Sequence, residues 1–222
     1  MTERGFKQAR ALLALDFERN WGGRTRGQPL QLYWGMKPQI LDRRVVYTGY
    51  LNVETFRIRL SDGAIVSRDV ERHGDAAAVL PFDATRRCAL VARLFRAPVF
   101  SVTAEESLEE ACAGMIEKES DEDTARREAH EELGVRLRAL ERVARVWSSP
   151  GVSVERQSLF LAAYVAADRI SAGGGVASEH ENITVLERPL AALALDVEQG
   201  IIADGKLITL VFALRLRRPE LF

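Results

Sequence analysis

Apolar and polar residues alternate from residue 51 to residue 60, which is the pattern of a strand with one buried face. The runs at 44–50 and 64–70 are predicted strands as well, and residues 61–63, Ser-Asp-Gly, predict a hairpin turn before the last of them. Three short strands cannot bury both faces of a sheet by themselves. We therefore expect this small antiparallel sheet to pack against a second subunit.

A second region begins with a near-continuous apolar run at 75–82, typical of a central strand that is buried on both faces. The residues that follow contain both strand patterns and helical spacing. Further strands are expected at 88–96, within 135–148, at 157–166 and at 182–188, and helices at 121–133, 189–199 and 204–216. This mixture predicts an α+β sandwich.

The chain before the strands has a different character. Apolar positions at helical spacing predict an amphipathic helix over 4–19, and a glycine-rich basic stretch at 21–29 predicts a flexible linker, with a phosphate contact as the alternative. We therefore predict three parts: an N-terminal helix and linker (1–38), a β-strand dimerisation region (39–73) and a main domain (74–218).

The composition is that of an ordinary soluble globular protein, with 222 residues, 47% hydrophobic and 28% charged residues, and a net charge of −1. This balance predicts no nucleic-acid surface, and no apolar run approaches the ~20 residues that span a membrane. Two cysteines, Cys88 and Cys112, are too few for a disulfide framework, so we expect buried reduced thiols. With no visible signal peptide, the sequence predicts a cytoplasmic protein.

The candidate chemistry lies in the helix expected at 121–133. Glu128, Glu131 and Glu132 are three or four residues apart and are expected on one face of it. Like charges on one face repel, and a divalent cation would remove the conflict. Oxygen ligands in this number suit Mg²⁺ or Mn²⁺, which in turn suit a substrate rich in phosphate oxygens. The alternative is a solvated acidic helix face.

The stretch from Ala113 to Val135 resembles the Nudix box, a pattern of Gly, five residues, Glu, seven residues and Arg-Glu-apolar-x-Glu-Glu-x-Gly-apolar. Residues 127–135 match the second half without a gap, and Glu119 lies at the right distance from Arg127. Gly114 lies one residue too close to Glu119, and Ala113 stands where the glycine should be. We interpret this as a one-residue deletion in the loop.

Other stretches resemble the Nudix branch that hydrolyses ADP-ribose and nucleotide sugars, and within it the GDP-mannose pyrophosphatase subgroup. The resemblance implies the Nudix fold, an α/β/α sandwich with a mixed sheet, and a homodimer formed through the N-terminal strands. The stretches that carry it are residues 70–79, 94–96, 110–114, 149–151, 173–175 and 179–183.

The resemblance also implies roles for single residues. Glu179, on a glycine-flanked loop, would be the catalytic base, and Glu131, the second catalytic candidate, would be a further metal ligand or an outer-shell partner of the ion. The Mg²⁺ or Mn²⁺ ligands would be the backbone carbonyl of Ala113 and the side chains of Glu128, Glu132 and Glu181. The substrate contacts would be Arg96, Ser149, Gly151, Glu155, Arg68 and Glu71. The alternative for these positions is an ordinary polar loop, turn or surface charge.

Together these features predict a Mg²⁺-dependent pyrophosphatase that cleaves a nucleoside diphosphate sugar, of the GDP-mannose or ADP-ribose type, into a nucleoside monophosphate and a sugar phosphate. One alternative is a Nudix hydrolase of another nucleotide, such as a dinucleoside polyphosphate or a coenzyme. Another is a non-catalytic Nudix module that binds a nucleotide sugar. Intact Glu128, Glu131 and Glu132 favour an enzyme, because a sensor would be expected to have lost at least one ligand.

Overall fold

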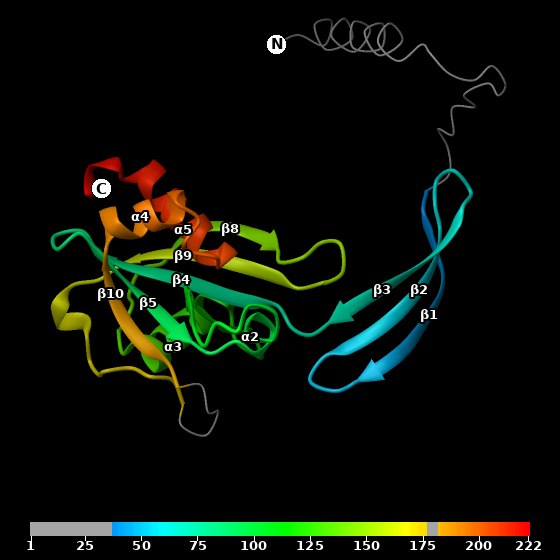
Figure 1. Ribbon diagram of the computed structural model, residues 1–222, viewed down its shortest axis with the longest axis horizontal. Coiled ribbons are helices and arrows are strands. Elements are labelled where there is room, and N and C mark those ends of the chain that lie inside the picture. Colours follow the sequence, from blue (N-terminus) through cyan, green and yellow to red (C-terminus); the bar gives the residue numbers. More distant parts are fainter. Residues whose placement is uncertain (1–36, 177–181) are drawn as a thin grey trace, which may run out of the picture. The chain divides into compact units, whose positions relative to one another are not determined.

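The computed structural model describes residues 37–176 and 182–222 (Figure 1). The helix expected over 4–19, the linker after it, and the candidates Glu179 and Glu181 lie outside the described residues. The predicted domain boundaries therefore stay a prediction.

The three N-terminal strands are confirmed. They form one sheet in the order β1-β2-β3, with β1 at Gln39–Thr48, β2 at Asn52–Arg59 and β3 at Ile65–Arg72. Gly63 has a φ of 86°, a left-handed conformation that glycine adopts without strain, so the hairpin turn lies where the sequence places it. All ten residues of β1 are exposed, including its apolar ones: Ile40, Leu41, Val45, Val46 and Tyr47.

The main sheet has seven strands in the order β10-β5-β4-β9-β8, with β6 paired to β5 and β7 paired to β4. Strands β4 and β9 run parallel, and the other pairs are antiparallel, so the sheet is mixed. The apolar run predicted to be a buried central strand is β4, at the middle of the sheet. The strands are β4 (Ala76–Asp83), β5 (Cys88–Leu94), β6 (Leu108–Glu110), β7 (Cys112–Met115), β8 (Glu141–Trp147), β9 (Arg156–Ala163) and β10 (Thr184–Pro189).

Helices cover both faces of this sheet (Figure 1). Successive residues of β4 point to opposite faces: Leu80 belongs to the core formed with α4 and α5, whereas Val79 belongs to the core formed with α3. This confirms the predicted α/β/α sandwich. The helices are α2 (Ala97–Thr103), α3 (Asp121–Leu133), α4 (Leu190–Glu198) and α5 (Gly205–Arg217), with 3-10 turns η1 (Ala166–Asp168) and η3 (Pro219–Leu221). Among the described residues, no helix is both long and apolar enough to cross a membrane.

Helix α3 has the bounds that the sequence predicts, because its ends are strongly specified. Ser120 caps the first turn by accepting a hydrogen bond from the Asp123 amide, at 3.1 Å. Gly134 ends the helix with a φ of 65°, and a Cβ atom there would lie 2.3 Å from the Ser171 carbonyl oxygen. Glycine is therefore required at this position by both conformation and space.

One stretch differs from the prediction. The strand expected at 88–96 ends at Leu94, and the chain then forms the short helix α2, with Pro98 in its first turn and no buried residue. Within 135–148, where one or two strands were expected, the strand β8 forms. Before it, Val135 makes an isolated bridge with Arg169, and Leu137 is buried in the core beside α3.

Candidate active site

A cleft of about 380 Å³ is lined by residues of α3, β4, β7, β9 and α5. Five of the residues predicted from the sequence line it: Arg96, Ala113, Glu128, Glu132 and Glu155. Three residues that the sequence did not single out, His73, Gln157 and Lys206, line it as well. The cleft combines carboxylates, cations and backbone groups from segments that are far apart in the sequence.

One face of the cleft is acidic. Glu128 and Glu132, one helical turn apart on α3, both line it beside Ala113 of β7. Glu132 is only 3% exposed, and its carboxylate accepts a hydrogen bond from the Ala113 amide at 3.2 Å. The Ala113 backbone and the two carboxylates therefore lie next to one another.

Gly114 lets Glu128 reach this position. A Cβ atom on Gly114 would lie 1.7 Å from Oε1 of Glu128, far inside any real contact. The glycine that the Nudix pattern requires is therefore supplied by Gly114, although Ala113 stands at the motif's register position. The shortened loop still brings the glycine against the Glu128 side chain of α3.

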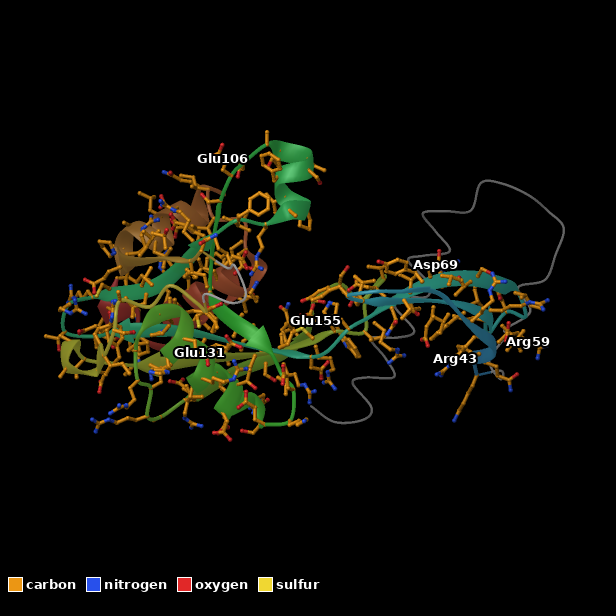
Figure 2. The ribbon with its side chains drawn as sticks, turned by 90° about the horizontal axis from the view of Figure 1, so that it is seen from below. Arg43, Arg59, Asp69, Glu106, Glu131 and Glu155 are labelled. Carbon is orange, nitrogen blue, oxygen red and sulfur yellow. The ribbon has the colours of Figure 1, made fainter. Side chains whose placement is uncertain are left out.

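Glu131 differs from its two neighbours. Its carboxylate accepts a hydrogen bond from Arg127 at 2.9 Å, and it is not among the residues that line the cleft. Figure 2 labels it on α3. Glu131 nevertheless shares a face of α3 with Glu128, as expected, because both carboxylates contact the same nitrogen of Arg127, Nη1, at 2.9 and 2.8 Å. Arg127 relieves the repulsion between them. The catalytic role of Glu131 stays a prediction.

Arg127 ties the acidic groups together. Besides Glu131, it contacts Glu128 at 2.8 Å and Glu119 at 2.9 Å. Burial lowers the pKa of Arg127, but these carboxylates outweigh burial, so its pKa ends above the ordinary value. Arg127 therefore stays charged and orients the Glu128 carboxylate.

The donor set fits a hard divalent cation. Within the described ranges no group of three or more His, Cys, Asp or Glu side chains is arranged to hold a metal, and the carboxylates Glu128 and Glu132 line the cleft together. Mg²⁺ is commonly held by one or two carboxylates together with waters and substrate phosphates, rather than by a cage made entirely of protein groups. Two carboxylates and a backbone carbonyl in an open cleft match that preference.

The other wall of the cleft is cationic. Arg96, which follows β5, and Lys206, in the first turn of α5, both line the cleft. Arg96 donates to both oxygens of Glu110, at 2.6 and 3.2 Å, and the Lys206 amine donates to Glu110 at 3.1 Å and to Asp204 at 2.7 Å. Burial lowers the pKa of Lys206, but Asp204 and Glu110 raise it further, so Lys206 is a cation.

The remaining substrate candidates are divided between places. Glu155, labelled in Figure 2, lines the cleft and accepts a hydrogen bond from Gln157 at 3.2 Å. Arg68 and Gly151 line a second cavity of about 520 Å³, beside Trp147. Their substrate roles stay predictions.

Two further candidates do not line the cleft. The Ser149 carbonyl accepts the Ser153 amide at 2.8 Å within a turn, and Glu71 pairs with His73 at 2.9 Å. Because His73 lines the cleft, Glu71 contacts a residue of the cleft without lining the cleft itself.

The glycine run, residues 173–175, packs on the end of α3. The Gly174 amide donates to the Glu132 carbonyl at 2.8 Å, and the Gly175 amide donates to the Glu131 carbonyl at 3.2 Å. A Cβ atom on Gly173 would lie 2.4 Å from the Glu132 carbonyl oxygen, so only glycine fits this approach. The loop is therefore anchored to the same helix end that carries Glu131 and Glu132.

Comparison with known proteins gives consistent matches. The family pattern described as "NUDIX domain" matches residues 72–196. The GDP-mannose pyrophosphatase of Cronobacter sakazakii is 37% identical over 166 residues, which cover 73% of this chain and 86% of that protein. The proteins of the same name from Pectobacterium atrosepticum and Escherichia coli are 36% and 32% identical, over 72% and 73% of this chain and 84% and 85% of theirs.

A solved structure described as "ADP compounds hydrolase" has a similar fold. Its TM-score is 0.67 at 20% sequence identity, and the match covers 83% of this chain and 96% of that one. At this identity the likeness supports the fold alone.

Proposed function

The chain belongs to the Nudix family, and on that premise we propose that it is a divalent-metal-dependent pyrophosphatase of a nucleoside diphosphate sugar. The products are a nucleoside monophosphate and a sugar phosphate. GDP-mannose is the first candidate, because relatives at 32–37% identity are named GDP-mannose pyrophosphatase, and ADP-ribose is the second. The observation that carries the proposal is a cleft with an acidic pair, Glu128 and Glu132, and two cations, Arg96 and Lys206.

Each part of the cleft has a role in this proposal. Glu128, Glu132 and the Ala113 carbonyl would hold Mg²⁺ or Mn²⁺, which when bound neutralises charge on the diphosphate and acidifies a water molecule. Arg96 offers a planar fork of donors that matches phosphate oxygens, and Lys206 offers a compact charge beside it. Their charges would favour a substrate with a diphosphate at its centre.

The catalytic base is proposed to be Glu179, with Glu181 as an additional metal ligand. Both lie outside the described residues. The support is the anchoring of the preceding glycines: Gly174 and Gly175 donate to backbone carbonyls at the end of α3. A base carried by a loop would let substrate binding complete the site.

A homodimer through the N-terminal strands is part of the proposal. Every residue of β1 is exposed, and its apolar side chains Val45, Val46 and Tyr47 are each about half exposed. Because successive side chains of a strand point to opposite faces, β1 exposes apolar side chains on both faces, and exposed apolar groups of this kind favour an interaction with another chain. Light scattering coupled to size exclusion should give twice the mass of the 24.7 kDa chain, and a monomer at micromolar concentration would contradict the proposal.

We also propose a cytoplasmic location. Cys88 and Cys112 are buried and form no disulfide in the described part of the chain, which suits a reducing compartment. Fractionation of cells that express the protein should place it with the cytoplasmic enzymes. Recovery in a membrane or periplasmic fraction would contradict this part of the proposal.

One assay tests the activity. Wild type and Glu132→Gln are incubated with Mg²⁺ and a panel of nucleotide sugars, dinucleoside polyphosphates and coenzymes that carry no phosphomonoester, together with alkaline phosphatase, which releases phosphate from monoester products and leaves the intact substrates uncleaved. We expect wild type to release phosphate from a nucleoside diphosphate sugar and Glu132→Gln to be at least about 100-fold slower. No turnover of any nucleotide sugar by wild type would sink the proposal, and preferred turnover of a dinucleoside polyphosphate or coenzyme would favour the alternative.

A further inference from the structure

A buried carboxylate joins the two cations of the cleft wall. Glu110, the last residue of β6, is 4% exposed. Both of its oxygens accept hydrogen bonds from Arg96, and one of them also accepts from Lys206. Arg96, Glu110 and Lys206 come from three separate segments, so Glu110 is the link that fixes the two cations relative to each other.

The link extends into the backbone beside the acidic pair. Asp204, the N-cap of α5, accepts from the Lys206 amine at 2.7 Å and from the Ala111 amide at 3.0 Å. Burial raises the pKa of Glu110, but the Arg96 hydrogen bond and the Lys206 charge lower it further, so its pKa ends below the ordinary value. Glu110 is thus an ionised group with two cationic partners, each of which faces the cleft.

Arg96 lies within electrostatic reach of three carboxylates. Burial lowers its pKa, but Glu110 and, to a lesser extent, Glu132 and Asp204 raise it, so its pKa ends above the ordinary value. Its side chain is 44% exposed, so solvent leaves it room to turn. Glu132 lines the same cleft as Arg96, whereas Asp204 is bonded to Lys206, so an arginine released from Glu110 would be drawn toward Glu132.

We propose that Glu110 is a positioning residue that holds Arg96 and Lys206 at the cleft wall for the diphosphate and keeps Arg96 from pairing with Glu132. Glu110 touches neither substrate nor metal and acts through the two cations. This role rests on the proposed function of the same cleft. It predicts that loss of the Glu110 charge weakens diphosphate binding and also weakens metal binding, through competition by Arg96.

Metal binding is measured first, with Mn²⁺ as the probe and its electron paramagnetic resonance signal as the readout. Glu110→Gln should bind Mn²⁺ about tenfold more weakly than wild type. The double variant Glu110→Gln/Arg96→Met should recover the affinity, because the competing guanidinium is gone. A general loss of structure cannot produce that recovery. Unchanged Mn²⁺ affinity in Glu110→Gln, or no recovery in the double variant, would overturn the proposal.

Diphosphate binding is measured with methylenediphosphonate, a non-hydrolysable probe, by calorimetry in Mg²⁺. Glu110→Gln should weaken it about tenfold. The matched control is Glu109→Gln: Glu109 precedes Glu110 on β6 and pairs with Arg93 and Arg188, neither of which lines the cleft. The control should bind both probes as wild type does. An equal loss in the control would overturn the proposal.

A charge-preserving variant keeps the proposal testable if Glu110→Gln misfolds. Glu110→Asp keeps the charge but shortens the side chain, so it should make only some of the hydrogen bonds that Glu110 makes with Arg96 and Lys206. It should therefore weaken the binding of Mn²⁺ and of methylenediphosphonate by a smaller factor than Glu110→Gln does. If Glu110→Gln does not fold, this variant decides, and wild-type affinities in Glu110→Asp would overturn the proposal.

The outcomes also separate the two proposals. If wild type hydrolyses no nucleotide sugar while Glu110→Gln still weakens both probes, the proposed function fails and the role of Glu110 stands. If wild type hydrolyses its substrate and Glu110→Gln behaves like Glu109→Gln, the role of Glu110 fails and the proposed function stands.

Discussion

Gly114→Ala is the perturbation with the most specific structural consequence. The added Cβ atom would lie 1.7 Å from Oε1, 2.1 Å from Cδ and 2.7 Å from Cγ of Glu128. Ordinary contacts between carbon atoms are about 3.5–4.0 Å. The Glu128 side chain must therefore move by more than about 1 Å, away from the position beside Glu132 at which we propose that it binds the metal.

The expected effect is large on activity and small on stability. A displacement of about 1 Å at a catalytic group can cost about 100-fold in rate. Gly114 has no left-handed φ, so alanine fits its backbone, and the change should alter the free energy of unfolding by no more than about 1 kcal/mol. The clash falls on the side chain of Glu128, which can turn away.

The assay measures kcat, the Mg²⁺ concentration for half-maximal rate and the unfolding midpoint in urea. Gly205→Ala is the control, because it adds the same methyl group where nothing lies within 4 Å. We expect Gly114→Ala to lower kcat about 100-fold and raise the Mg²⁺ requirement, with a midpoint near wild type. Wild-type kcat and Mg²⁺ dependence in Gly114→Ala would refute the claim that Glu128 binds the metal from this position.

Three further predictions concern metal binding, stability in acid and packing of the core. Glu132→Gln should keep the fold, as judged by circular dichroism, and lose Mn²⁺ affinity in a direct titration; full affinity would remove Glu132 from the metal site. Arg142 lowers the pKa of Asp121 from 3.8 to about 2, so this pair stabilises the fold above pH 3.8 and the stabilisation is lost as the pH falls toward 2. In urea titrations Asp121→Asn should lower the free energy of unfolding by about 1 kcal/mol at pH 7, a value reduced because solvent screens this partly exposed pair, and should leave it almost unchanged near pH 2. A difference between wild type and variant that does not change with pH would contradict this. Leu133→Ala, at a fully buried position, should cost about 2–5 kcal/mol in the same titration, and a cost below about 1 kcal/mol would contradict the packing of α3.

Much of the fold could be predicted because its signals are local. Helix α3 has an acidic first turn and a terminal Gly134, and both are readable without tertiary information. The central strand β4 is a continuous apolar run, which only a doubly covered strand tolerates. The short helix α2 was missed because its apolar residues are exposed and give no helical face.

The part of the site within the motif was predictable from helical spacing, whereas Arg96 and Glu155 were predicted through the family resemblance. Spacing places Glu128 and Glu132 one turn apart, and it also places Arg127 one turn before Glu131, with which it pairs. The cationic wall depends on Glu110 meeting Lys206 across 96 positions of sequence, and no local pattern announces such a contact. The N-cap Asp204 predicts where α5 begins but not what its first turn faces.

The most direct test of the central claim is ³¹P nuclear magnetic resonance of GDP-mannose incubated with the protein and Mg²⁺. Cleavage of the diphosphate in this cleft predicts that the two diphosphate signals are replaced by two phosphomonoester signals, those of GMP and mannose 1-phosphate, and that Glu132→Gln leaves the spectrum unchanged over the same time. A spectrum that stays unchanged with wild type, or one in which wild type and Glu132→Gln give the same products at the same rate, would contradict the claim.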